Sequence, residues 1–153
     1  IKMANFKNQI NMNHPKVSES LKINTPASDI WNRIKSFDRV EDYAGGMISH
    51  SEVKGQGVGC ERTCTMNSEQ GEITIKEVIT EFNDSVKHLK YSVQNPPMPV
   101  MNMENSISVK DLGEGSEVTW ESYFDADESQ VEEISSMLQG MIKMNLEGIK
   151  NLF

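Results

Sequence analysis

The stretch VEEISSMLQGMIKMNLEGIKNLF, residues 131–153, repeats its apolar side chains at intervals of three and four residues. This spacing predicts an amphipathic α-helix that buries one face. The apolar face consists of Val131, Ile134, Leu138, Met141, Ile142, Leu146, Ile149 and Leu152. A stripe along one side of it is formed by Met137, Met141 and Met144.

Asn145 departs from this pattern, because at about 100° per residue it falls near the middle of the apolar face. A buried amide costs roughly 1–3 kcal/mol unless a partner satisfies it. The sequence leaves two explanations open. Either a cavity that holds water or a polar-headed ligand meets Asn145, or a residue on a neighbouring strand bonds to it.

The size and charge of the chain limit its partners. Its 153 residues suffice for one domain with a sizeable core, and its net charge is −8. Nucleic acids and anionic membranes bind basic surfaces, so neither is expected as a partner. No apolar run reaches about 18 residues, which predicts no stable membrane insertion. Monomer and weak dimer both remain open.

Cys60 and Cys64 lie four residues apart in a segment that reads as a strand. Their Cα atoms would then be roughly 13 Å apart, too far for a disulfide. Two free thiols favour the cytoplasm, with the periplasm as the alternative if a signal peptide has been removed. The chain starts with Ile1, so we expect the native start to lie upstream or at Met3.

The pattern along the chain predicts one α+β domain. Residues 1–16 are polar and read as a flexible N-terminal arm, and 17–153 form the domain. A strand at 17–24 precedes a helix that starts at Thr25-Pro26, with Thr25 as N-cap, and a short helix at 38–43. Six strands follow at about 47–54, 58–66, 72–81, 86–93, 101–110 and 116–124, and the long helix begins near Asp127.

Strands in this order predict one antiparallel sheet that meanders, with the last helix laid across it. A sheet of six or seven strands curls, because adjacent strands twist against one another. A curled sheet around one helix can leave a hollow between them.

Seven short phrases stand out in order along the chain: Ala27-Ser28-Asp29-Ile30-Trp31, Gly57-Val58-Gly59-Cys60-Glu61-Arg62, Glu77-Val78-Ile79, Pro96-Pro97-Met98-Pro99-Val100, Val118-Thr119-Trp120, Glu121-Ser122-Tyr123 and Lys143-Met144-Asn145-Leu146. In this order they resemble the START-like (SRPBCC) superfamily of polyketide cyclases/dehydrases, lipid-transfer proteins, pollen-allergen-like proteins and plant abscisic acid receptors. The resemblance implies a helix-grip fold: a seven-stranded curved antiparallel sheet around the C-terminal helix, with two short helices after the first strand. It also implies a pocket for an apolar small molecule, faced by Arg62, Glu77, Glu121 and Asn145.

The chain departs from the hormone receptors of that superfamily. Their gating loop aligns with Asn67-Ser68-Glu69-Gln70-Gly71, their latch with Met98-Pro99-Val100, and their pocket lysine with a position near Ile48. Hormone sensing through that gate is therefore not expected.

Two charged residues fall on strand faces that alternation turns inward. Arg62 shares its face with Cys64 and Met66, and Glu77 shares its face with Ile75. Charges on an apolar face must be paired. Either Arg62 orients a ligand oxygen bidentately at the polar end of a pocket, or the two form an internal ion pair that fixes the register of the sheet.

The last strand supports two readings. Alternation places Val118, Trp120 and Ser122 on the core face, whereas the resemblance turns Glu121 inward. A bulge would reconcile them. Of the three histidines only His50 is a conceivable general base, and their spacing gives no metal signature.

We predict that the protein binds or transports a hydrophobic or amphipathic small molecule, lipid-like or polyketide-like, without catalysis and without a cofactor. The alternatives are a cyclase or dehydratase that uses pocket acid/base residues, and a partner-binding scaffold. The predicted ligand-binding residues are Ile48, Arg62, Cys64, Met66, Ile75, Glu77, Tyr91, Val93, Met98, Val100, Met103, Asn105, Glu121, Met137, Met141 and Asn145.

Overall fold

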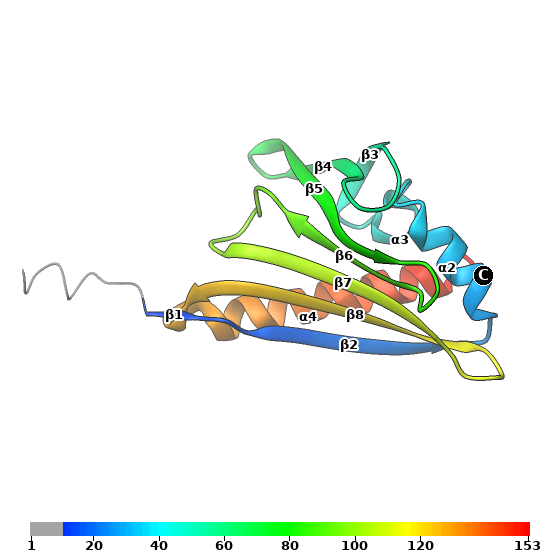
Figure 1. Cartoon of the computed structure of the whole chain (residues 1–153). Helices are drawn as coiled ribbons and strands as arrows, with labels where there is room; N and C mark the ends of the chain where they lie inside the picture. Colours follow the sequence, from blue (N-terminus) through cyan, green and yellow to red (C-terminus); the bar gives the residue numbers. More distant parts are fainter. Residues whose placement is uncertain (1–10) are drawn as a thin grey trace, which may run out of the picture.

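Strands of one antiparallel sheet curve around a single long helix in the computed structural model, which describes residues 11–153 (Figure 1). The strands are β1 (Met12–Asn13), β2 (Lys16–Ile23), β3 (Ile48–Lys54), β4 (Glu61–Ser68), β5 (Gly71–Asn83), β6 (His88–Val93), β7 (Met101–Asp111) and β8 (Ser116–Asp127). The helices are α2 (Ala27–Lys35), α3 (Glu41–Ala44) and α4 (Glu128–Lys150). The strand order is β1-β8-β7-β6-β5-β4-β3, and β2 also pairs with β8. The predicted α+β helix-grip fold is confirmed.

The first described residues lie against β8. Of the predicted arm, residues 1–10 lie outside the described residues, Met12–Asn13 pairs with Asp127 and Ala126, and Lys16 is already in β2. The two-residue strand β1 continues the line of β2 beyond Pro15, whose carbonyl accepts a hydrogen bond from the Phe124 N–H. This short strand is the eighth, in addition to the seven that were predicted.

Helix α2 begins differently from the prediction. Pro26, not Thr25, holds the N-cap position, and no side chain caps the helix. Proline suits a helix start, because the first N–H groups have no partner within the helix. The helix then buries Ile30, Trp31 and Ile34 against the sheet.

Helix α4 follows the predicted pattern. Asp127 is its N-cap, and the carboxylate accepts a hydrogen bond of 3.1 Å from the Ser129 N–H. The helix buries Ile134, Leu138, Ile142, Leu146 and Ile149 and packs mainly against β2, β8 and α3. No helix among the described residues is both long and apolar enough to span a bilayer.

Burial along β8 alternates without interruption. Its buried residues are Ser116, Val118, Trp120, Ser122, Phe124 and Ala126. The reading by alternation is therefore correct, and the inward orientation that the resemblance implied for Glu121 is wrong. Glu121 is directed away from the core and pairs with Lys16 at 3.3 Å. The register shift lies between Met101 and Glu104 of β7, so it does not turn Glu121 inward.

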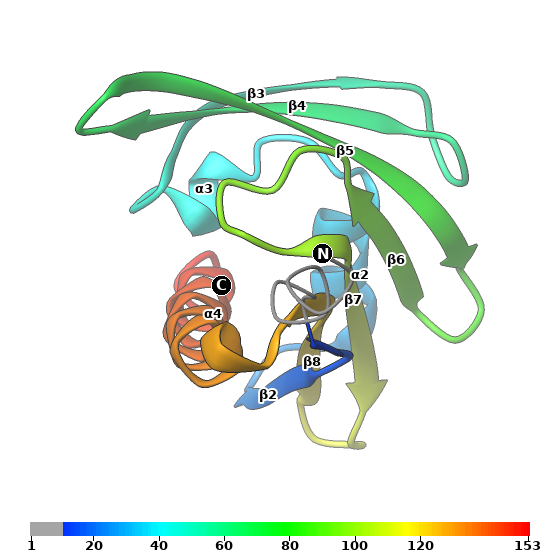
Figure 2. The same cartoon turned by 90° about the vertical axis from the view of Figure 1, so that its left-hand side faces the viewer.

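The sheet curves away from α4 at its far side. Seen end-on, β3, β4 and β5 arch over α3, while β8 stays beside α4 (Figure 2). Helix α3 packs directly on α4 at Gly148, where an added Cβ would lie 2.1 Å from the Tyr43 carbonyl oxygen. Side chains of α4, the α3 region and the middle strands line the cavity described below.

Candidate functional site

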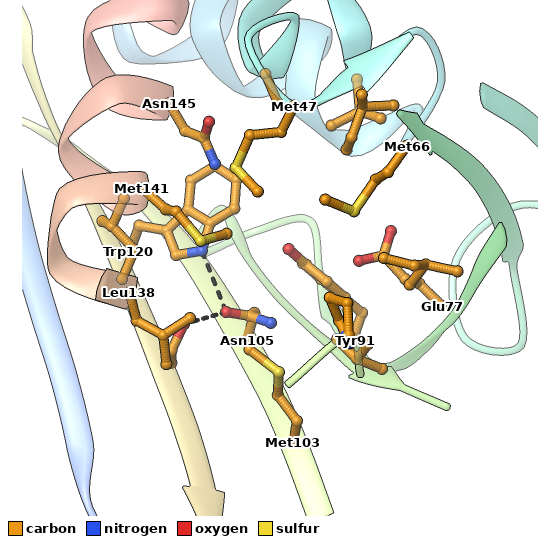
Figure 3. Close-up of a pocket in the computed structure, with 18 of the residues that line it drawn as sticks. Met47, Met66, Glu77, Tyr91, Met103, Asn105, Trp120, Leu138, Met141 and Asn145 are labelled. Carbon is orange, nitrogen blue, oxygen red and sulfur yellow. Dashed lines mark hydrogen bonds between the residues drawn. The ribbon is translucent and has the colours of Figure 1, made fainter. Parts of the chain in front are cut away.

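A cavity of about 90 Å³ lies between α4 and the inner face of the sheet (Figure 3). It is lined by Val40, Ala44, Met47, Ile48, Arg62, Met66, Ile75, Glu77, Tyr91, Val93, Pro97, Met98, Met103, Asn105, Trp120, Ser122, Leu138, Met141, Ile142 and Asn145. Most of these side chains are apolar, and the polar ones are concentrated on the sheet.

The structure brings together most of the residues that the sequence pointed to. The predicted residues that line the cavity are Ile48, Arg62, Met66, Ile75, Glu77, Tyr91, Val93, Met98, Met103, Asn105, Met141 and Asn145. The strand alternation and the helical face that predicted them are thus reproduced in three dimensions.

Four predicted residues do not line the cavity. Cys64 is buried behind Glu77, Val100 packs on the core, and Glu121 lies on the outer face. Met137 is 44% exposed and lines a groove outside the cavity. His50, the conceivable base, is also outside, because the strand shifts register between Ile48 and His50 and leaves its side chain 62% exposed.

The sequence did not assign eight of the lining residues to the site, although a periodic pattern in the sequence indicates that some of them face inward. Trp120 and Ser122 follow from alternation along β8, and Leu138 and Ile142 belong to the apolar face of α4. Val40, Ala44 and Met47 surround α3, whose position over the sheet no local pattern fixes. Pro97 belongs to the loop that already contains Met98.

A row of polar side chains crosses the inner face of the sheet on five successive strands. In the strand register Arg62 lies opposite Glu77, Tyr91 opposite Asn105, and Asn105 opposite Ser122. These five residues line one side of the cavity, and the aliphatic and thioether side chains of α4 line the other. A molecule in the cavity therefore meets a polar wall and an apolar wall.

Arg62 and Glu77 form a buried ion pair. The Arg62 Nε donates to Glu77 Oε1 at 2.7 Å, and Nη1 donates to the Phe37 carbonyl at 3.2 Å. The guanidinium lies 3.6 Å from the centre of the Phe37 ring and is 2% exposed. Burial alone would lower the pKa of Arg62, but the Glu77 carboxylate raises it, so the guanidinium stays charged. The internal ion pair is therefore present, and because Nε and Nη1 already have partners, only Nη2 is without one among residues 11–153.

One of the two carboxylate oxygens of Glu77 accepts no hydrogen bond from the described residues. Its Oε1 accepts from Arg62 and from the Cys64 thiol, at 2.7 and 3.3 Å. Its Oε2 has no hydrogen-bond partner among residues 11–153, and Glu77 lines the cavity. Burial, and next the Glu77 carboxylate, raise the pKa of Cys64 to about 12, which keeps this thiol protonated.

Tyr91 and Asn145 reach the cavity from opposite walls (Figure 3). Burial, and next the charge of Glu77, raise the pKa of Tyr91 well above its ordinary value, so the phenol keeps its proton. Within the described part of the chain, neither the Tyr91 hydroxyl nor the Asn145 amide has a hydrogen-bond partner. The Asn105 Oδ1 accepts hydrogen bonds from Trp120 Nε1 at 3.4 Å and from the Ser122 hydroxyl. The amide N–H groups of Asn105 have no hydrogen-bond partner in the described part of the chain.

A groove of about 460 Å³, here called the outer groove, lies against the cavity. It runs along α4 beside Gln130, Ile134 and Met137. Five residues line both the cavity and the groove and are here called the partition: Met47, Met66, Pro97, Met98 and Met141. Unbranched thioether chains change rotamer easily, so this partition can move without a change in the backbone.

No metal centre accompanies the cavity. Over residues 11–153, no three His, Cys, Asp or Glu side chains are placed to hold a metal ion.

Comparison with known proteins identifies relatives of this fold. The family model described as polyketide cyclase / dehydrase and lipid transport matches residues 14–153. No curated protein matches the chain.

Solved structures match the chain over nearly its whole length. An uncharacterised protein of Bacillus thuringiensis is 26% identical with a TM-score of 0.77, and the match covers 91% of this chain and 98% of that one. A protein of Thermobifida fusca is 21% identical with a TM-score of 0.77, over 88% and 90%. A norcoclaurine synthase mutant of Thalictrum flavum, in complex with a transition-state analogue, is 17% identical with a TM-score of 0.75, over 94% and 96%. The two matches below 25% identity show the fold alone.

Proposed function

The chain belongs to the polyketide cyclase/dehydrase and lipid transport family, and on that premise we propose that it binds an apolar or amphipathic small molecule in the cavity beneath α4. The observation that carries the proposal is an apolar cavity into which Asn145 and Tyr91 place polar groups without protein partners. Ligand sites combine a mostly apolar lining with a few such groups, which fix the orientation of the ligand. Leaving the groups unsatisfied costs stability, and a ligand or water removes that cost.

The small volume of the cavity supports binding with rearrangement of its wall. Ligand pockets usually enclose about 300–1,000 Å³, more than this cavity offers. Movement of the methionine partition would join the cavity to the outer groove of about 460 Å³. The joined space would be lined mostly by apolar side chains, which suits an apolar ligand larger than the cavity alone can hold.

A fluorescence titration tests the proposal. The neutral lipophilic dye N-phenyl-1-naphthylamine should bind the wild type with micromolar affinity and a negative heat-capacity change in calorimetry. Met141→Trp should weaken binding at least tenfold, because Met141 lines both the cavity and the groove. Met144→Trp is the matched control on the same helix, since Met144 is 60% exposed and lines neither. Equal affinity in the two variants, or no binding by the wild type, would contradict the proposal, and the latter would favour the scaffold alternative.

Catalysis is the second candidate, and one observation favours it. Glu77 and Tyr91 point into the same space from adjacent strands (Figure 3). A carboxylate oxygen without a partner and a protonated phenol are a base and an acid of the kind that a cyclase or dehydratase needs. If a bound ligand is turned over, Tyr91→Phe should slow the reaction without abolishing binding, whereas a pure carrier releases the ligand unchanged in mass spectrometry.

A further inference from the structure

We infer that the polar end of the ligand is a hydrogen-bond donor without negative charge, a hydroxyl or an amine, and that carboxylates are disfavoured. This inference rests on the proposed function, because it concerns the ligand of the same cavity. It follows from the charges and hydrogen-bonding groups that a molecule in the cavity can reach.

The more exposed of the two charges in the cavity is negative. Among the described residues that line it, only Arg62 and Glu77 are charged. Arg62 is 2% exposed against 8% for Glu77, lies against the Phe37 ring, and has Nε and Nη1 already bonded, which leaves only Nη2 without a partner in residues 11–153. Glu77 offers Oε2, which has no partner in residues 11–153. A ligand therefore meets the Glu77 carboxylate as the more exposed of the two charges, because the guanidinium is nearly buried and mostly bonded.

The neighbouring neutral groups complete a site for a hydroxyl. The Tyr91 hydroxyl is a donor on the strand next to Glu77, and the Asn105 amide N–H groups follow one strand farther along the polar row. A ligand hydroxyl can donate to Glu77 Oε2 and accept from Tyr91. A protonated amine can donate to Oε2 and gains the attraction of opposite charges.

A carboxylate fits this site poorly. It has no proton to give to Oε2, and it would place a second negative charge next to Glu77 in a mostly apolar cavity. Like charges brought together at a binding site disfavour the complex. The net charge of −8 adds a weaker repulsion at longer range.

Three probes of one chain length isolate the head group: decan-1-ol, decylamine and decanoate. Isothermal titration calorimetry at pH 7.5, below their aggregation concentrations, measures the affinity of each for the wild type. The alcohol and the amine should bind at least tenfold more tightly than decanoate. Decanoate binding as tightly as either would overturn the inference while leaving the proposed function intact. Failure of all three to bind would overturn the proposed function and the inference with it.

Variants assign the preference to Glu77. Glu77→Gln alone leaves Arg62 buried without its counter-charge, so the double variant Arg62→Met/Glu77→Gln is the better test. In this variant the three affinities should converge to within about threefold, because the charge that discriminates between the head groups is gone. Glu121→Gln makes the same change on the outer face of the sheet and should leave the ranking as in the wild type. A ranking that survives the double variant would overturn the assignment, and if that variant does not fold, the wild-type ranking decides.

Discussion

At the scale of single residues, Arg62 connects the cavity to the linker between α2 and α3. Its guanidinium bonds to Glu77 on one side and to the Phe37 carbonyl on the other. Phe37 has a φ of 66° and Arg39 a φ of 46°, a region that residues with a side chain rarely adopt. The hydrogen bond and the stacking of Arg62 on the Phe37 ring help to hold this unfavourable backbone in place.

Removal of one partner from the ion pair should be costly. We expect Glu77→Ala to lower the free energy of unfolding by about 3–5 kcal/mol, because it leaves the Arg62 charge buried without compensation. Urea denaturation followed by circular dichroism measures the change. Glu52→Ala is the control: its side chain is 77% exposed, and the loss should stay within about 0.5 kcal/mol. A loss below about 1 kcal/mol for Glu77→Ala would contradict the burial of the pair.

The two thiols should be inert in the native protein. Cys60 and Cys64 are each 1% exposed, and burial is the main cause that raises the pKa of both. Since the thiolate is the reactive form, Ellman's reagent at pH 8 should label neither residue without denaturant and both in guanidinium chloride. Rapid labelling of the folded protein would show that β4 opens more readily than its buried position suggests.

At the scale of elements, α4 contains two glycines that differ in the space around them. An added Cβ at Gly148 would lie 2.1 Å from the Tyr43 carbonyl oxygen, whereas at Gly140 it would meet no atom within 4 Å. Gly148 therefore allows the backbone of α3 to pack on α4, and Gly140 has no comparable contact.

Alanine at each position tests this difference. Gly140→Ala should stabilise the protein by about 0.5–1 kcal/mol, because alanine favours the helix. Gly148→Ala should instead destabilise it by more than 1 kcal/mol, because α3 must move away. Since α3 carries part of the cavity wall, Gly148→Ala should also weaken dye binding. Thermal unfolding of the two variants gives the comparison, and equal shifts of the same sign would be evidence against the close approach.

The elements were predictable where the pattern is local and periodic. The face of α4 and the alternation in β4, β5 and β8 identified most of the cavity wall, because each strand residue points to one of two sides. The prediction for Glu121 failed because the resemblance was followed against the alternation of its own strand. His50, which the sequence favoured as a surface histidine, is exposed, because a register shift after Ile48 reverses the side to which it points.

What the sequence did not reveal are relations between elements that lie far apart in the chain. The packing of α3 on α4 depends on the absence of a Cβ at Gly148, about a hundred residues after α3. The hydrogen bond from Arg62 to the Phe37 carbonyl depends on the path of the linker between α2 and α3. No periodicity records either, so the sequence left open whether Arg62 was part of an ion pair or a ligand-binding group.

At the scale of the whole molecule, surface carboxylates make stability depend on pH. Hydrogen bonds from Trp31, Ser129 and Ser36 lower the pKa values of Asp84, Asp127 and Asp38 in the folded state. A lowered folded-state pKa contributes stability above the unfolded value of about 4, and that stability is lost as the pH falls through the folded value.

The melting temperature should therefore fall as the pH drops below about 4, and change little between pH 5 and 7. Differential scanning fluorimetry from pH 2.5 to 7 measures the profile. Asp84→Asn should flatten the acid limb, because the asparagine cannot titrate. An acid limb as steep as that of the wild type would exclude Asp84 as a contributor.

The pairing of β2 with β8 has a consequence for how the chain acquires its fold. Ser20 and Thr119 contact each other across 99 residues of sequence, so during synthesis β2 has no partner until β8 has left the ribosome. Until α4 follows, the apolar faces of β2 and β8 against which it packs stay exposed, and such surfaces favour aggregation. Contacts between residues so far apart in sequence slow folding. In stopped-flow refolding we expect a folding time of milliseconds to seconds, whereas helical bundles fold in microseconds to milliseconds. A hydrophobic molecule that occupies the open sheet early would shorten the exposure, and the cell's supply of ligand would then affect the yield of folded protein.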